Sequence, residues 1–115
     1  SEKTIQKLGG WQRISPDTTD PVYAYKDTLS NVSISVSQQP LPSSFETSPE
    51  EELSTLAKSY NATKNIGTED SAIYVGTSAK GPQSVLTIKQ DVLVLMKSEK
   101  TVKNNQWRKY VASLK

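Results

Sequence analysis

Two of the side chains that most often carry out chemistry in proteins are missing from this chain of 115 residues, which contains no histidine and no cysteine. Histidine is the usual general base near neutral pH, and the cysteine thiolate is a common nucleophile and zinc ligand. Without them, catalysis would depend on carboxylates, hydroxyl groups or lysines. We therefore expect a domain without enzymatic activity, and we expect no cofactor and no metal ion.

Catalysis by carboxylates is the alternative to a domain without enzymatic activity. Residues 50–52 are all glutamate, but they stand at a predicted helix start, where acidic side chains stabilise the helix dipole. Asp17 and Asp20 would supply two ligands, which are too few for a calcium site. A pair of carboxylates on facing elements would suit a hydrolase of cell-envelope glycans, and we keep this as an alternative function.

Residues 76–81 have the G-x-x-x-x-G spacing of a phosphate-binding loop. Such a loop continues with Lys and then Ser or Thr, and it opens a helix. Here Pro82 and Gln83 follow, and a strand is predicted after them. Thr77 and Lys80 give only a Thr-x-x-Lys spacing, not the Ser-x-x-Lys of serine–lysine catalysis. We interpret the segment as a hairpin turn.

A polar, uncharged strand face is the first candidate for binding a partner. Within residues 31–38, apolar side chains alternate with serines, which indicates a half-buried strand. A proline-rich loop follows. This face would suit a peptide, a glycan or a sheet edge, although an ordinary solvent-facing strand has the same pattern. The candidate residues are Ser33, Ser35, Ser37, Gln38 and Gln39.

The last part of the chain is basic and forms the second candidate. Residues 97–115 contain six basic side chains against one acid, Glu99. Such a segment would suit an anionic membrane surface or a nucleic acid, with Lys97, Lys103 and Lys109 as contacts. A solvated helix face has the same composition. The net charge of the whole chain is only +2, which disfavours a nucleic-acid partner.

These candidates must be positioned by a sheet. Residues 84–89 and 92–97 read as two strands joined by a tight turn, and residues 92–96 are apolar without a break. A strand with water on one face alternates, so we expect both faces of this strand to be covered and the strand to be central. Further strands are predicted at residues 11–14, 22–27, 31–38, 63–66 and 71–77.

Two amphipathic helices are predicted to cover the sheet, at about residues 49–60 and 104–114. The first begins with Ser48 as the capping residue and Pro49 in the first turn, and Asn61 is a suitable end. The second carries an apolar stripe that includes Trp107 and Tyr110. A short N-terminal helix is a further candidate within residues 1–10. The pattern predicts one α+β domain over residues 1–115, with a single antiparallel sheet of about five to six strands.

Four short segments carry a resemblance to known proteins: YKD at 25–27, SQQPLP at 37–42, GPQ at 81–83, and Trp107-x-x-Tyr110. Together they resemble small uncharacterised bacterial domains that sit behind a single N-terminal membrane anchor. The architecture is also similar to the Mog1/PsbP type of fold. The resemblance implies an extracytoplasmic domain, at the cell surface or in the periplasm, with residues 1–10 as the tail of a linker or anchor.

We therefore expect a non-enzymatic binding or structural domain of a membrane-anchored bacterial protein. Its partner would be a protein or a glycan of the cell envelope, and its membrane contact would come through the anchor. The glycan hydrolase and the binder of anionic surfaces remain the alternatives.

Overall fold

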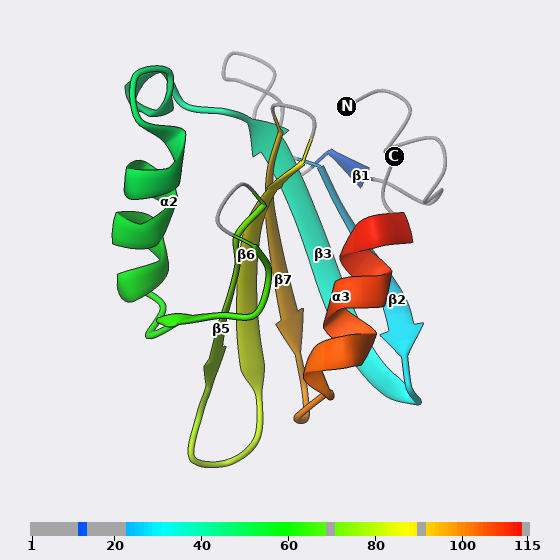
Figure 1. Ribbon diagram of the computed structural model, residues 1–115. Coiled ribbons are helices and arrows are strands. Elements are labelled where there is room, and N and C mark those ends of the chain that lie inside the picture. Colours follow the sequence, from blue (N-terminus) through cyan, green and yellow to red (C-terminus); the bar gives the residue numbers. More distant parts are fainter. Residues whose placement is uncertain (1–11, 14–22, 69–70, 90–91, 114–115) are drawn as a thin grey trace.

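The computed structural model describes residues 12–13, 23–68, 71–89 and 92–113. These residues form one antiparallel sheet of seven strands in the order β1-β2-β3-β7-β6-β5-β4, together with two α-helices (Figure 1). The strands are β1 (Gln12–Arg13), β2 (Tyr23–Leu29), β3 (Val32–Pro40), β4 (Lys64–Asn65), β5 (Ile73–Thr77), β6 (Gln83–Lys89) and β7 (Val92–Ser98). The helices are α2 (Pro49–Lys58) and α3 (Asn104–Ser113), with a short 3-10 turn η1 (Ser43–Phe45) before α2.

The predicted α+β class, the single antiparallel sheet and the two helices are confirmed. The two outermost strands of the sheet, β1 and β4, are only two residues long. Strand β7 is the fourth of the seven and pairs with β3 and β6, as expected for the apolar central strand. The candidate helix within residues 1–10 lies outside the described residues.

The two helices pack on opposite faces of the sheet (Figure 1). Trp107 and Val111 of α3 join a cluster formed by Val36, Val94 and Met96 of β3 and β7. Trp107 is fully buried, with 0% of its surface exposed. Because aromatic side chains bury a large apolar area, this contact holds the C-terminal helix on the sheet.

Helix α2 covers the other face. Leu53 and Ala57 are buried against Leu86 of β6 and Leu93 of β7, and Phe45 of η1 joins the same cluster. Alternate side chains of β6 and β7 thus point to opposite faces of the sheet and pack into two separate hydrophobic cores, one under each helix. This explains why residues 92–96 are apolar without interruption.

The ends of α2 differ in part from the sequence interpretation. The Ser48 side chain makes no capping hydrogen bond, although its carbonyl oxygen accepts from the Glu52 amide at 3.0 Å. Asn61 does mark the end of this segment: its φ is +57°, in the left-handed region that asparagine tolerates better than most residues. The Ala62 amide then donates to the Ala57 carbonyl at 2.9 Å.

Among the described residues, helix α2 covers only part of its sheet face. Its contacts with the sheet are mostly with β6 and β5, and a shallow hollow lies between it and Ser37 and Gln39 of β3 (Figure 1). On β3, Ile34 and Val36 are buried under the α3 side, while Ser33 and Ser35 on the α2 side are exposed. None of the described helices is long and apolar enough to cross a bilayer.

Candidate functional site

The exposed side chains of β3 form a continuous polar strip along the open part of the α2 face. We use the name polar strip for Ser33, Ser35, Ser37 and Gln39. Ser33 and Ser35 are exposed, and Ser37 and Gln39 are half-buried. The Ser37 hydroxyl donates to the Leu95 carbonyl at 3.3 Å, which orients it toward β7. Four of the five residues expected on this strand face are therefore side by side.

Gln38, the fifth residue, does not belong to this surface. It lies on the opposite face, toward α3, and only 3% of it is exposed. Its Oε1 is buried and has no hydrogen-bond partner in the described part of the chain. The period of two along a strand accounts for the difference, because Gln38 has the same parity as Ile34 and Val36. The expectation that Gln38 shares a strand face with Ser33, Ser35 and Ser37 is therefore wrong.

Lys97 joins the polar strip from the neighbouring strand. In the sheet register, Ser35 of β3 lies opposite Lys97 of β7 on one side and opposite Lys26 of β2 on the other. Direct cross-strand neighbours point to the same face, so Lys26, Ser35 and Lys97 form one row across the sheet. Sequence analysis identified Lys97 in a different context, as part of a basic terminal segment, and it missed Lys26.

Tyr60, just after α2, forms the wall beside Lys97. The Lys97 Nζ lies 5.6 Å from the centre of the Tyr60 ring, within the range of a cation–π contact. Tyr60 also contributes to the α2-side core, but it is half-buried, so its remaining surface faces the open side of the sheet.

Three shallow hollows follow this surface. One of about 140 Å³ is lined by the lysine–serine row, with Ser33 and Glu99 at its side. A second of about 140 Å³ lies between the polar strip and α2, where Tyr60, Leu56 and Leu95 line it. A third of about 260 Å³ continues beyond Lys97 toward the loop between β5 and β6. Lys97 and Tyr60 each line two of the three hollows.

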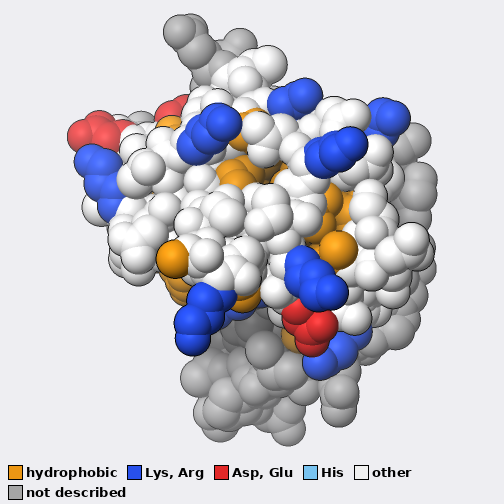
Figure 2. All heavy atoms as spheres, turned by 90° about the horizontal axis from the view of Figure 1, so that it is seen from below, with side chains coloured by type: hydrophobic (Ala, Val, Ile, Leu, Met, Phe, Trp, Pro, Cys, Tyr) orange, Lys and Arg blue, Asp and Glu red, His pale blue; other side chains and the backbone are white. Residues whose placement is uncertain are grey.

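Lys103 and Lys109 are not part of this surface. Lys103 directly precedes α3, where its carbonyl accepts from the Trp107 amide at 3.2 Å, and Lys109 is exposed on α3 itself. Helix α3 covers the opposite face of the sheet. The three lysines chosen from the basic segment thus do not form a single patch. The view of Figure 2, from below, shows Lys and Arg side chains distributed around that end of the molecule, where they outnumber the acidic ones.

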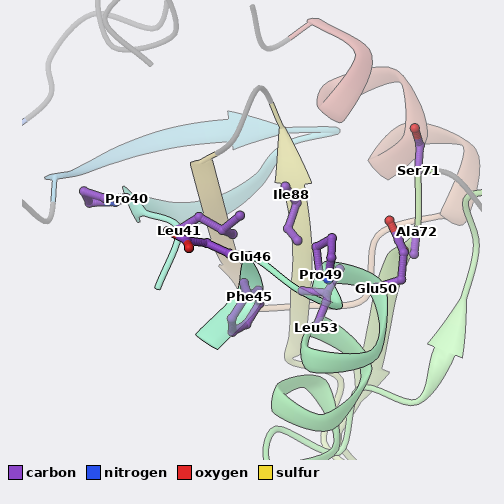
Figure 3. Close-up of a pocket in the computed structure, with 10 residues that line it drawn as sticks. All are labelled: Pro40, Leu41, Phe45, Glu46, Pro49, Glu50, Leu53, Ser71, Ala72 and Ile88. Atoms are coloured by element: carbon purple, nitrogen blue, oxygen red, sulfur yellow. The ribbon is translucent and has the colours of Figure 1, made fainter. Parts of the chain in front are cut away.

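A larger hollow, of about 600 Å³, lies at the opposite end of α2 (Figure 3). Its lining is mostly apolar and includes Leu41, Phe45 and Ile88. Glu46 and Glu50 also line it, and both are exposed. A carboxylic acid that works near neutral pH needs a desolvated or like-charged environment, which exposed side chains do not have. The hollow is better suited to an apolar group than to acid–base chemistry.

Among the residues that the structure describes, no group of three acidic side chains lies close enough together to hold a metal ion. Comparison with known proteins finds no matching family model, and neither a curated protein nor a solved structure is significantly similar to this chain.

Proposed function

We propose that this protein is a non-catalytic binding domain and that its polar strip binds an extended, hydroxyl-rich ligand such as a glycan. One observation carries the proposal: helix α2 covers only part of its sheet face, and along β3 the open part presents three serines and one glutamine, with Lys26 and Lys97 on the neighbouring strands. Hydroxyl and amide groups both donate and accept hydrogen bonds, which matches the donor and acceptor pattern of a sugar chain.

The pairing of β3 with strands on both sides restricts how a ligand can bind to it. Strand β3 is paired with β2 on one side and with β7 on the other. Its backbone groups are therefore occupied, and a peptide cannot add to it as a further strand. A ligand has to contact the side chains from above the sheet. The half-buried Tyr60 and Leu95 beside the strip supply apolar surface for the faces of sugar rings.

The resemblance described above supports an extracytoplasmic location for this function. In this proposal the domain is tethered to a bacterial membrane in the full-length protein and meets its ligand in the cell envelope. Binding through exposed hydroxyl groups is weak at each contact because water competes for the same groups. A repeating ligand compensates for weak contacts by offering many of them.

The test is a blocking substitution in the strip. Ser35→Trp places a large side chain in the middle of the surface, and tryptophan is well tolerated in strands. Calorimetric titration with a set of hexasaccharides, including cellohexaose, chitohexaose and galacturonate hexamers, should give binding to at least one of them. We expect Ser35→Trp to weaken that binding at least tenfold. The matched control Ala112→Trp, at an exposed site on α3, should bind normally. Equal binding by both variants would contradict the proposal.

The carboxylate hydrolase is the second candidate, and Glu46 and Glu50 are the two carboxylates that line the apolar hollow together. The two functions differ in what happens to the ligand. If the domain only binds, mass spectrometry after prolonged incubation should recover every oligosaccharide at its original length. Cleavage that is lost in Glu46→Gln or Glu50→Gln would favour the hydrolase instead.

A further inference from the structure

We propose that Lys26, Ser35 and Lys97 form an anion-binding subsite within the polar strip, so that the ligand is an extended chain bearing carboxylate or phosphate groups. This inference rests on the function proposed above and narrows its ligand class. Both lysine side chains are exposed on the open face of the sheet, and Lys97 also contacts the Tyr60 ring.

The geometry of the sheet brings the three groups together. Lys26 lies opposite Ser35, and Ser35 lies opposite Lys97, so the row runs straight across β2, β3 and β7. Neighbouring strands are ~4.8 Å apart, which puts the backbones of the two lysines roughly 10 Å from each other. Their side chains are long enough to converge over the Ser35 hydroxyl. An anionic oxygen at that point would accept hydrogen bonds from two ammonium groups and one hydroxyl group.

The row also lies in a hollow and not on a convex surface. The hollow has a volume of about 140 Å³, and Lys26, Ser35 and Lys97 all line it. A water molecule occupies about 30 Å³ of liquid, so this space accommodates a carboxylate or phosphate group together with some of its water. Glu99 lines the same hollow and carries the opposite charge. Its carboxylate lowers the attraction for an anion. Removing the charge of Glu99 should therefore strengthen anion binding, whereas removing the charge of either lysine should weaken it.

A polymer fits this subsite better than a lipid bilayer does. Lys80, Lys100 and Lys103 are exposed in the loops before β6 and before α3, and both loops lie at the lower end of the molecule in Figure 1. A planar bilayer at this end would contact the loop lysines, whereas Tyr60 lies beside Lys97 of the row and α2 lies beside Ser37 and Gln39 farther along the strip. A flexible chain can instead enter along β3. The loop lysines would then act at longer range, by raising the rate at which an anionic chain arrives.

The experiment compares ligands that differ only in charge. Galacturonate hexamer and its methyl ester have the same backbone, and a short polyphosphate tests the phosphate group. We expect at least one anionic probe to bind about tenfold more tightly than the neutral ester at low salt. This preference should decline as salt is raised, as it does for polyanions that release counterions on binding. Affinities are measured by calorimetry at two salt concentrations.

Three substitutions then test whether the preference for the anionic probe over the ester comes from Lys26, Lys97 and Glu99. Lys26→Gln and Lys97→Gln should each weaken binding of the anionic probe by about threefold to fivefold, a typical effect for one exposed charge, and leave binding of the ester nearly unchanged. Glu99→Gln should strengthen binding of the anionic probe. Lys109→Gln makes the same charge change on α3, away from the strip, and should have no effect on either ligand.

The outcomes separate the two proposals. Equal binding of the ester and both anionic probes, weakened by Ser35→Trp, would overturn the anion subsite and leave the binding function in place. No binding of any oligosaccharide or of polyphosphate would overturn both. Retention on anionic phospholipid vesicles that depends on Lys80, Lys100 and Lys103 but not on Lys26 would replace the subsite with a membrane contact.

Discussion

Gln83 connects the C-terminal helix to the sheet through one buried amide group. Its Oε1 accepts from the Trp107 indole Nε1 at 2.9 Å and from the Val102 backbone amide at 2.7 Å. Its Nε2 donates to the Thr77 hydroxyl at 2.9 Å. Both the oxygen and the nitrogen of this buried amide therefore have hydrogen-bond partners, and the two bonds to Oε1 fix how the chain enters α3.

We expect Gln83→Leu to lower the free energy of unfolding by about 2–4 kcal/mol, because two buried donors lose their acceptor. Urea denaturation measures the change. Thr77→Val removes only the third, more exposed hydrogen bond and should cost less than about 1 kcal/mol. If the two variants were equally stable, the amide would not have the role described here.

Gln38 should respond in the opposite way. Its buried Oε1 has no partner among the described residues, so the native side chain already carries a desolvation cost. Gln38→Leu is expected to leave stability unchanged or to raise it by about 1 kcal/mol in thermal unfolding. Because Gln38 lies on the α3 side, the same variant should bind any strip ligand normally. Loss of binding would indicate that Gln38 reaches the ligand after all.

Helix α3 depends on its apolar side chains more than on its local sequence. Trp107 anchors it on the sheet, and the Lys89 Nζ donates to the Val111 carbonyl at 3.0 Å near its C-terminal end. The Tyr110 hydroxyl donates to the Asp27 carboxylate of β2 at 2.8 Å. A cation near the last carbonyls is favourable for the helix dipole. Sequence periodicity predicted the apolar stripe, but it gave no sign of Lys89, which lies 22 residues away from its acceptor.

Trp107→Ala should destabilise the protein by about 3–5 kcal/mol, the usual range for removing a large aromatic side chain from a core. Denaturant titration followed by far-ultraviolet circular dichroism gives the value. Lys109→Ala, an exposed position on the same helix, should change stability by less than about 0.5 kcal/mol. An unchanged unfolding curve for Trp107→Ala would mean that α3 is not packed as described.

Strand β5 passes very close to the segment that follows α2. A Cβ atom added at Gly76 would lie 2.4 Å from the backbone oxygen of Asn61, and backbone cannot move aside as a flexible side chain can. Gly76→Ala is therefore expected to cost about 1–3 kcal/mol through overpacking. Gly81 has a φ of +108°, but a Cβ atom added there would make only ordinary van der Waals contacts with Thr101, the nearest at 3.6 Å. A comparison of the two alanine variants by thermal unfolding separates steric contact from backbone strain, and a stable Gly76→Ala protein would contradict the close approach.

At the scale of the whole molecule, the sheet is covered by one helix on each face, and the coverage is unequal. The alternation of residues 31–38 and the apolar run of residues 92–96 predicted a half-open strand and a doubly covered strand, and both strands have these properties. The sequence could not reveal which strands are neighbours. Ser35 and Lys97 are 62 positions apart, and only the pairing of β3 with β7 makes them adjacent. For the same reason, the candidate lysines of the basic segment separated onto different faces.

The proposed ligand site on the open part of the α2 face can be mapped residue by residue. The measurement is a nuclear magnetic resonance titration of the isotope-labelled protein with the galacturonate hexamer and with its methyl ester. We expect the largest amide shift changes on β3 and on the adjacent part of β7, around Ser33, Ser35 and Lys97, with little change on α3. Changes confined to α3, or to the apolar hollow around Phe45 and Ile88, would contradict the proposed site.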